Sequence, residues 1–196
     1  MILSRKHKFI FFCNGKTGTT SIEHALKQYD ESGPLNFQAP GLWVTKHVPP
    51  AAVKALMPAE EWKSYFKFVG FRNPMTWIVS QYRHNFGRYA SLPITPEIVY
   101  EIYNHLKQFR ALPHTDTLFQ SSYFEDSDRQ RIVDFRIRME TINEDIKQVS
   151  DRLGIVIDLP FLNAAVPPMT DNLITDEAVP LIRNIWYQDF CLDKSL

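Results

Sequence analysis

The sequence predicts an α/β fold in which a central parallel sheet carries helices on both faces, a three-layer sandwich. Residues 9–13 and 65–71 are short apolar runs of the kind that form buried strands, and each is followed by a turn and a helical pattern. Strands that alternate with helices are typical of parallel sheets, whose ligands bind beyond the carboxyl ends of the strands. The functional residues are therefore expected at these two turns.

The length and composition are those of one folded unit. The chain has 196 residues, 44% of them hydrophobic, so residues 1–196 are expected to form a single domain with one core. Lysine plus arginine number 22, as do aspartate plus glutamate, which leaves no net charge to attract nucleic acid or an anionic membrane. Any recognition of anions must be local, and no nucleic-acid partner is expected.

The basic start of the chain is followed by the apolar run 9–13, which is too short for a signal peptide or a membrane span. The two cysteines, Cys13 and Cys191, lack the spacing of a metal site or a disulfide framework. We therefore expect buried free thiols, no transmembrane segment and a cytoplasmic location.

The first predicted strand, 9–13, runs into a glycine turn rich in hydroxyl groups, and a helical pattern begins at Ile22. Backbone N–H groups at such a turn, together with the positive end of the helix dipole, favour an anion. Lys16 adds a full charge, and nearby hydroxyls add further hydrogen-bond donors. The predicted anion-binding residues here are Gly15, Lys16, Thr17, Gly18, Thr19, Thr20 and Ser21.

The remaining elements follow in chain order. A short apolar stretch at 42–44 predicts a strand with His47 at its end, and the proline pair at 49–50 can open a helix. Residues 132–137 are interpreted as a further strand. The other helices are expected near 75–87, 95–110, 141–153 and 176–190.

The second core strand, 65–71, ends in Arg72-Asn73-Pro74, and Ser80 follows about two turns into the next helix. The planar fork of arginine suits a phosphate dianion, and proline fixes the start of the helix so that nearby amides are aimed. We therefore expect Arg72 and Ser80 to face the same phosphate.

A kinase or nucleotide triphosphatase loop is the rival interpretation, because Gly15-Lys16-Thr17 matches the end of a Walker A motif. That motif needs a glycine five residues before Gly15, where this chain has Ile10 inside the strand. Phosphoryl transfer also favours a metal-binding aspartate at a strand end, whereas the second strand ends in Arg72. The sequence thus favours an anion site that works without a metal.

With these two turns the chain resembles the PAPS-dependent sulfotransferases, where PAPS is 3'-phosphoadenosine 5'-phosphosulfate, and in particular their compact carbohydrate-type branch. Residues 16–21 are similar to the family's 5'-phosphosulfate loop, with Gly15 in place of the usual proline. The family's 3'-phosphate motif is matched by Arg72-Asn73-Pro74, Ser80 and Tyr82-Arg83, with Trp77 or a neighbour where an arginine is usual. Weaker similarities extend the resemblance over nearly the whole chain.

The resemblance implies a P-loop NTPase-like sulfotransferase fold and an enzyme that moves a sulfuryl group from PAPS to an acceptor hydroxyl of a carbohydrate or glycan. PAP is the product, and no metal is expected. In this interpretation Lys16 stabilises the departing phosphate or the sulfonate. Arg72 and Ser80 bind the 3'-phosphate, and Arg138 is a further candidate for a phosphate contact.

The resemblance also points to a general base. Related carbohydrate enzymes use a histidine in a similar Lys-His context, which favours His47. His84, His24 and Glu23 are alternatives. Two other functions stay open: a metal-dependent P-loop kinase, and a protein that binds PAP or PAPS without transferring sulfate.

Overall fold

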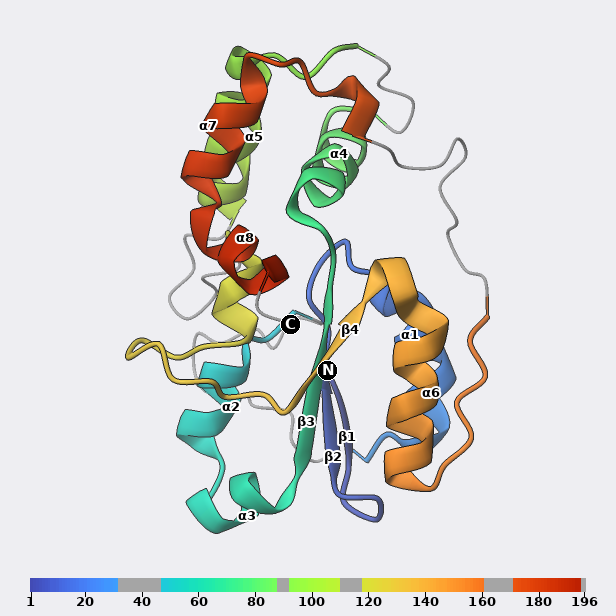
Figure 1. The fold of residues 1–196 in the computed structure, drawn as a ribbon. Coiled ribbons are helices and arrows are strands. Elements are labelled where there is room, and N and C mark those ends of the chain that lie inside the picture. The colour runs from blue at the N-terminus through green and yellow to red at the C-terminus, as the bar shows by residue number, and fades with distance from the viewer. Residues whose placement is uncertain (32–46, 88–91, 110–117, 161–170, 195–196) are drawn as a thin grey trace.

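The computed structural model describes residues 1–31, 47–87, 92–109, 118–160 and 171–194, which fold into an α/β structure (Figure 1). The strands of this part of the chain form one sheet in the order β1-β2-β3-β4. They are β1 (Ile2–Ser4), β2 (Phe9–Phe12), β3 (Phe66–Phe71) and β4 (Phe135–Arg138).

The sheet is mixed, which corrects the expectation of a wholly parallel one. β2, β3 and β4 are parallel to one another, whereas β1 pairs with β2 in antiparallel orientation. Between β1 and β2 the chain turns through Lys8, whose φ is 53°. The sequence did not indicate β1 because its three residues are too few to show a period.

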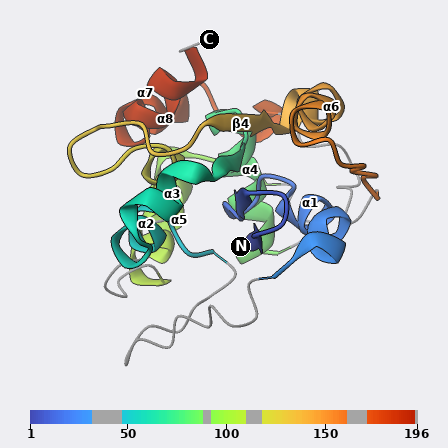
Figure 2. The ribbon, with the colours of Figure 1, turned by 90° about the horizontal axis from the view of Figure 1, so that it is seen from below.

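Helices cover both faces of the sheet. Figures 1 and 2 show α1 and α6 on one face and α2 and α3 on the other. The α-helices are α1 (Thr19–Leu26), α2 (Pro50–Leu56), α3 (Ala59–Ser64), α4 (Pro74–Asn85), α5 (Pro96–Phe109), α6 (Ile142–Leu153), α7 (Ala178–Ile185) and α8 (Tyr187–Lys194). Single 3-10 turns are η1 (Lys27–Tyr29), η3 (Gln120–Tyr123), η4 (Met139–Thr141) and η5 (Asp171–Leu173).

Successive side chains of β2 face opposite sides of the sheet, and helices cover both sides, which explains why the strand is an uninterrupted apolar run. Phe9 and Phe11 pack with residues of α1 and α6, whereas Ile10 and Phe12 pack with residues of α2 and α3. All four side chains are fully buried. A strand covered on both faces has no position left for a polar residue, so the period-two pattern of a half-exposed strand is absent.

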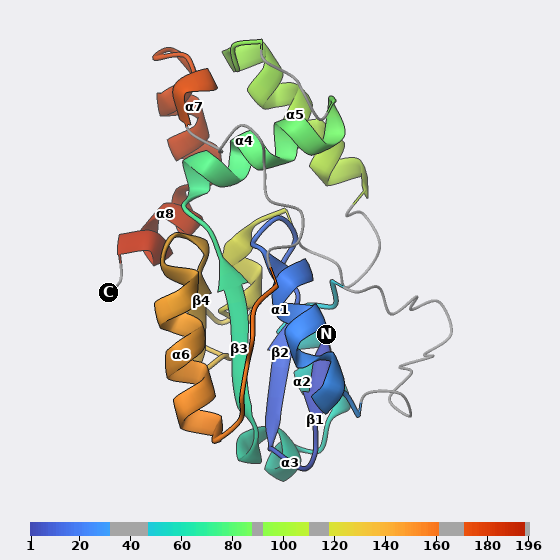
Figure 3. The same ribbon diagram turned by 90° about the vertical axis from the view of Figure 1, so that its right-hand side faces the viewer.

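The remaining helices pack on one another in a separate cluster beyond the carboxyl ends of the parallel strands. We call α4, α5, α7 and α8 together the helical cap; Figure 3 shows α4, α5 and α7 above the end of β3. Its buried cluster includes Trp77 of α4, Val99 of α5, Ile182 of α7 and Phe190 of α8. The cap therefore lies at the edge of the sheet where ligands were expected.

Most of the predicted elements are confirmed. The strands at 9–13 and 65–71 and the helices near 75–87, 95–110 and 141–153 are present with small changes at their ends. The helix predicted at 176–190 is divided at Trp186 into α7 and α8, and the strand predicted at 132–137 begins only at Phe135. The strand predicted at 42–44 lies outside the described residues.

The two cysteines differ in their surroundings. Cys13 is buried, as predicted, and forms no disulfide with the other cysteine. Cys191 is exposed, so the expectation of a buried thiol was wrong for this residue. It lies on α8 beside the exposed Tyr187, and their hydrogen bond raises the pKa of the Tyr187 hydroxyl. Within the described ranges, no helix has the length and apolar character needed to cross a membrane.

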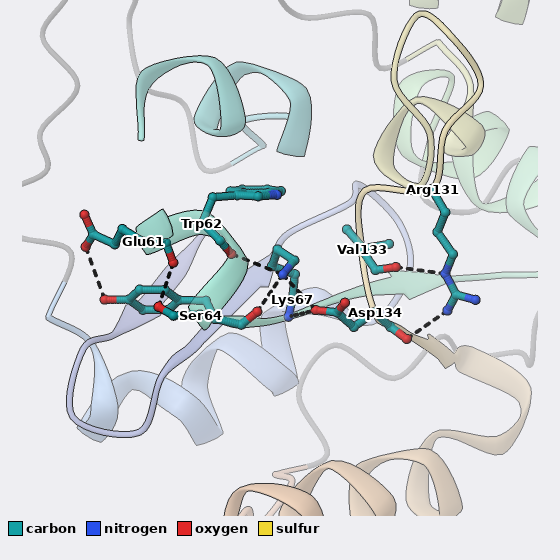
Figure 4. A network of polar contacts seen from close by, with 8 residues as sticks. Glu61, Trp62, Ser64, Lys67, Arg131, Val133 and Asp134 are labelled. Atoms are coloured by element: carbon teal, nitrogen blue, oxygen red, sulfur yellow. Dashed lines mark hydrogen bonds and ion pairs between the residues drawn. The ribbon is translucent and has the colours of Figure 1, made fainter. Parts of the chain in front are cut away.

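At its amino end, β3 is held by a buried lysine (Figure 4). The Lys67 ammonium donates to the carbonyl oxygens of Tyr65 at 2.6 Å and Trp62 at 3.3 Å. It also pairs with Asp134 at 3.0 Å, and the same carboxylate oxygen accepts the Lys67 backbone N–H at 2.8 Å. Only 8% of the lysine side chain is exposed. Lys67 thus joins the end of α3, the start of β3 and the segment before β4.

We expect Lys67→Met to lower the free energy of unfolding by about 2 kcal/mol, because two carbonyl groups and a carboxylate lose a buried donor. Chemical denaturation measures this change. Lys63→Met is the matched control: that side chain is 69% exposed and pairs with the exposed Glu60, so its loss should change stability by less than about 0.5 kcal/mol. Equal effects of the two substitutions would contradict the role of Lys67.

Candidate functional site

The loop between β2 and α1 holds two residues in the left-handed conformation. Lys16 has a φ of 66° and Gly18 a φ of 73°. Glycine adopts this conformation freely, whereas a residue with a side chain pays about 1 kcal/mol for it. Turns of this kind gather successive backbone N–H groups into a concave anion-binding site. Gly18 also precedes the first residue of α1, so the amino end of that helix faces the same loop.

The loop lies directly against β3. The Asn14 side chain donates from Nδ2 to the Gly70 carbonyl oxygen at 3.2 Å, and the Thr17 hydroxyl donates to the Asn14 carbonyl oxygen at 2.9 Å. A methyl group on Gly70 would come within 2.3 Å of the Thr17 hydroxyl oxygen. The contact therefore depends on a glycine at this position of β3. Thr17 is fully buried and its hydroxyl proton is used within the loop, so in this arrangement the hydroxyl holds the loop together.

The other hydroxyl residues of the predicted turn lie on the first turn of α1. Thr19 is buried, Ser21 is half-buried and Thr20 is exposed. Gly18 is closely covered by η4, since a side chain there would meet the Met139 sulfur at 2.5 Å. The structure thus brings the predicted residues 15–21 into one turn, with different exposure to solvent.

Arg72 follows β3 directly and is half-buried. Its Nε donates to the Thr76 hydroxyl at 3.1 Å. Desolvation lowers the pKa of the guanidinium, and the charge of Glu140 acts in the opposite direction. Among the ion pairs in the described part of the chain, none includes Arg72. A partly desolvated cation without a paired carboxylate is well suited to an anionic ligand.

The main chain of Arg72 is fixed by one amide side chain. Gln120 accepts the Arg72 backbone N–H at 3.0 Å and donates to the Arg72 carbonyl oxygen at 2.9 Å. The buried carboxylate of Asp189, on α8, accepts the backbone N–H groups of Gln120 at 3.0 Å and Ser121 at 2.8 Å. The position of Arg72 therefore depends on η3 and on the last helix that the structure describes.

Helix α4 begins immediately after Arg72. Asn73 caps it by accepting the Met75 backbone N–H at 3.0 Å, and Pro74 is its first residue. Ser80 is buried and follows Thr76 by four residues, so the two lie on the same face of α4. Thr76 contacts the Arg72 guanidinium, and Ser80 lies one turn further along that face. That Arg72 and Ser80 bind one phosphate stays a prediction.

We call residues 14–18, between β2 and α1, the anion loop after its predicted ligand; His47 lies beside its start. Its Nδ1 is 2.7 Å from the Cys13 carbonyl oxygen, and its own carbonyl oxygen accepts the Tyr123 hydroxyl at 2.6 Å. Because a carbonyl can only accept, Nδ1 carries the proton in the neutral ring and Nε2 carries the lone pair. His47 stands in the turn before α2, and the residues of the strand predicted before it lie outside the described part.

His84 lies in the field of Lys16. The positive charge of Lys16 lowers the pKa of His84, and partial burial and the charge of His105 lower it further. His84 is on the last turn of α4, so this helix extends from Arg72 to the neighbourhood of the anion loop. The other alternative bases are on α1, where Glu23 is half-buried and His24 is exposed.

Arg138 is already engaged by a carboxylate. Its guanidinium binds Asp145 with two hydrogen bonds, of 3.0 Å from Nε and 2.8 Å from Nη2. Burial alone would raise the pKa of Asp145, but hydrogen bonds from Arg138 and Thr141 outweigh it and lower the pKa. In this structure Arg138 ties β4 to α6. The contact of Arg138 with a phosphate stays a prediction, and a phosphate would have to compete with Asp145 for the guanidinium.

Two residues that shape the site were missed in the sequence, Gln120 and Asp189. Trp77 was noted only at the place of the family's arginine, and its contact with the loop was not predicted: its indole donates to the Gly15 carbonyl oxygen at 2.9 Å. Gln120 and Asp189 act across more than forty positions of the chain, and no local pattern marks such partners. Within the described residues, no group of three or more His, Cys, Asp or Glu side chains is arranged to hold a metal ion.

Comparison with known proteins gave no match: no family model fits the sequence, and no curated protein or solved structure is significantly similar to it.

We expect Gly70→Ala to destabilise the protein by about 1–3 kcal/mol, because its methyl group would overlap the Thr17 hydroxyl. Thermal or chemical unfolding measures the effect. Thr17→Ala, which removes that hydroxyl, should reduce the cost of Gly70→Ala when the two substitutions are combined. Strict additivity of the two effects would show that the loop does not lie against β3 as described.

Proposed function

We propose that this protein is a PAPS-dependent sulfotransferase that transfers a sulfuryl group to an acceptor hydroxyl and releases PAP. One observation carries the proposal: two anion turns stand side by side, after β2 and after β3, which are neighbouring parallel strands. PAPS bears anionic groups at both the 5' and the 3' position of one ribose. A ligand of this kind needs two anion sites a short distance apart, each with its own cation.

Lys16 and Arg72 are the two cations. In the proposed complex, the loop of residues 15–21 binds the 5'-phosphosulfate, with backbone N–H groups and the Lys16 ammonium as donors. Arg72 and Ser80 bind the 3'-phosphate, the group that distinguishes PAPS from ordinary adenylates. The half-buried state of Arg72 supports this role, because a guanidinium in a region of low dielectric attracts a dianion more strongly than one in water.

The proposed reaction is an in-line displacement at sulfur. The acceptor oxygen forms a bond to sulfur while the bond between sulfur and the 5'-phosphate oxygen breaks, and the electron pair stays on that phosphate. Lys16 stabilises the charge that grows there, an effect of about 10²–10³ in rate for a single well-placed donor. The proton of the acceptor hydroxyl passes to Nε2 of His47, the ring atom that carries the lone pair.

We propose a carbohydrate as the acceptor. An exposed aromatic side chain at the end of α4 supports this: Phe86 is 38% exposed and makes ring contacts with Tyr82 and His105, both at 5.8 Å between centroids. Aromatic rings present the flat apolar surface against which sugars pack. Phe86 follows His84 by two residues, and the charge of Lys16 lowers the pKa of His84. This supports a position of the Phe86 ring near the proposed point of transfer.

Calorimetric titration with PAP tests the donor site. We expect wild type to bind PAP more tightly than AMP or ADP, with no dependence on magnesium, and Arg72→Ala to lose at least tenfold in affinity, since it loses a charge-assisted contact. Arg152→Ala is the matched control, because that guanidinium lies 4.0 Å from the ring of Phe66, at the opposite end of β3. A preference for ATP with magnesium would instead support the kinase.

The role of His47 is tested by His47→Asn, whose amide nitrogen can replace Nδ1 as donor to Cys13 while the proton acceptor is lost. We expect PAP affinity to stay within about twofold, whereas the rate of acceptor-dependent PAP release from PAPS falls by about 10²–10⁴. Screening against carbohydrate acceptors supplies the assay. An undiminished rate would contradict the role of His47 and leave His84 or Glu23 as the base. If the wild type binds PAP but turns over no acceptor, the result would favour a protein that binds PAP without transferring sulfate.

A further inference from the structure

Trp77 is a fully buried residue of α4 that reaches the anion loop. Its indole Nε1 donates a hydrogen bond of 2.9 Å to the Gly15 carbonyl oxygen. The ring packs edge-on against Trp186, with centroids 6.4 Å apart and planes at 64°. Trp186 is also fully buried and donates to the Leu118 carbonyl oxygen at 3.1 Å. The core of the helical cap therefore holds Trp77 in a fixed position against the loop.

The bond from Trp77 orients the next peptide group. In a planar trans peptide, the carbonyl of Gly15 and the N–H of Lys16 point in opposite directions. Because this carbonyl faces the indole, the Lys16 N–H is turned to the opposite side of the loop, away from the core of the cap. A rotation of this peptide would turn the Lys16 N–H toward the cap and put a carbonyl oxygen, which repels anions, in its place.

The same bond supports a strained residue. Lys16 holds a φ of 66°, a conformation that residues with side chains reach only when their surroundings impose it. The indole hydrogen bond acts on the peptide group immediately before Lys16, so it limits the return of this residue to an ordinary conformation. A buried hydrogen bond of this kind contributes enough to offset such a strain.

We propose that Trp77 is a positioning residue for the anion loop, which it keeps in its binding conformation through the Gly15 carbonyl. The identity of the anion, the 5'-phosphosulfate of PAPS, rests on the proposed function; the positioning does not. Trp77 or a neighbour stands where the sulfotransferases that the chain resembles usually have an arginine. A fully buried indole acts on the ligand through the loop and not by direct contact.

The competing explanation is that Trp77 only fills the core of the cap. Trp77→Phe and Trp186→Phe separate the two, since each deletes a buried indole that donates to a main-chain carbonyl, and only Trp77 donates to the loop. We expect both variants to lower the melting temperature. Only Trp77→Phe should weaken PAP binding, by about tenfold, and shift the amide resonance of Lys16 in a ¹H–¹⁵N spectrum.

A second variant removes only the hydrogen bond. Replacement of Trp77 by 3-benzothienylalanine keeps the bicyclic shape and puts sulfur in place of the indole N–H. This variant should retain the stability of the core and still lose affinity for PAP. Affinity equal to that of wild type, with an unchanged Lys16 resonance, would overturn the inference and leave Trp77 as a core residue.

A titration with inorganic sulfate keeps the inference distinct from the proposed function. If wild type ignores PAP but sulfate shifts the Lys16 amide, and Trp77→Phe weakens that response, the positioning role holds and the sulfotransferase proposal fails. If PAP binds equally to wild type, Trp77→Phe and Trp186→Phe, the proposed function survives and the positioning role is wrong. If wild type responds to neither probe, the loop binds no anion and both proposals fall.

Discussion

The close contact between the anion loop and β3 is the constraint on which the site depends. Gly70 has no side chain, so Thr17 can approach β3 to a distance that a methyl group would prevent. The Asn14 side chain bridges the same two segments. With this contact, the turns after β2 and β3 lie beside each other, as the proposed site requires. Without it, the loop would have to move away from the sheet. A glycine inside a strand weakens that strand, but here it allows the loop to lie directly against β3.

The two halves of the site are supported from different directions. The loop around Lys16 is held by the sheet below and by Trp77 from the helical cap. The main chain of Arg72 is held by Gln120, which Asp189 of α8 fixes in turn. The distance between the two cations is thus set by the way the cap sits on the sheet. Asp189 of α8 therefore matters to the position of Arg72, more than a hundred residues earlier in the chain.

The sequence revealed the architecture better than the arrangement of the site. β2 and β3 were predictable because strands buried on both faces are continuous apolar runs, and the two turns were predictable because glycine, lysine and arginine follow those runs directly. β1 was too short to show a pattern, and its antiparallel pairing followed from no residue type. Partners of a side chain could not be predicted, because no local pattern shows which residues the fold brings together. Arg138, a candidate for a phosphate contact, is bound by Asp145 in the structure.

The contrast between Arg72 and Arg138 gives the strongest structural support for a phosphate site after β3. Both arginines stand at the carboxyl ends of neighbouring parallel strands, with Phe71 and Arg138 in register. Arg138 is paired with the buried Asp145, and its hydrogen bonds lower the pKa of that carboxylate although burial acts in the opposite direction. Arg72 is partly desolvated, and its guanidinium donates to the Thr76 hydroxyl. The nearest acidic influence that the described structure gives it is the charge of Glu140, whose carboxylate accepts the neighbouring Asn73 backbone N–H at 2.8 Å. This difference in pairing is what we expect if Arg72 binds the anion that we propose for the site.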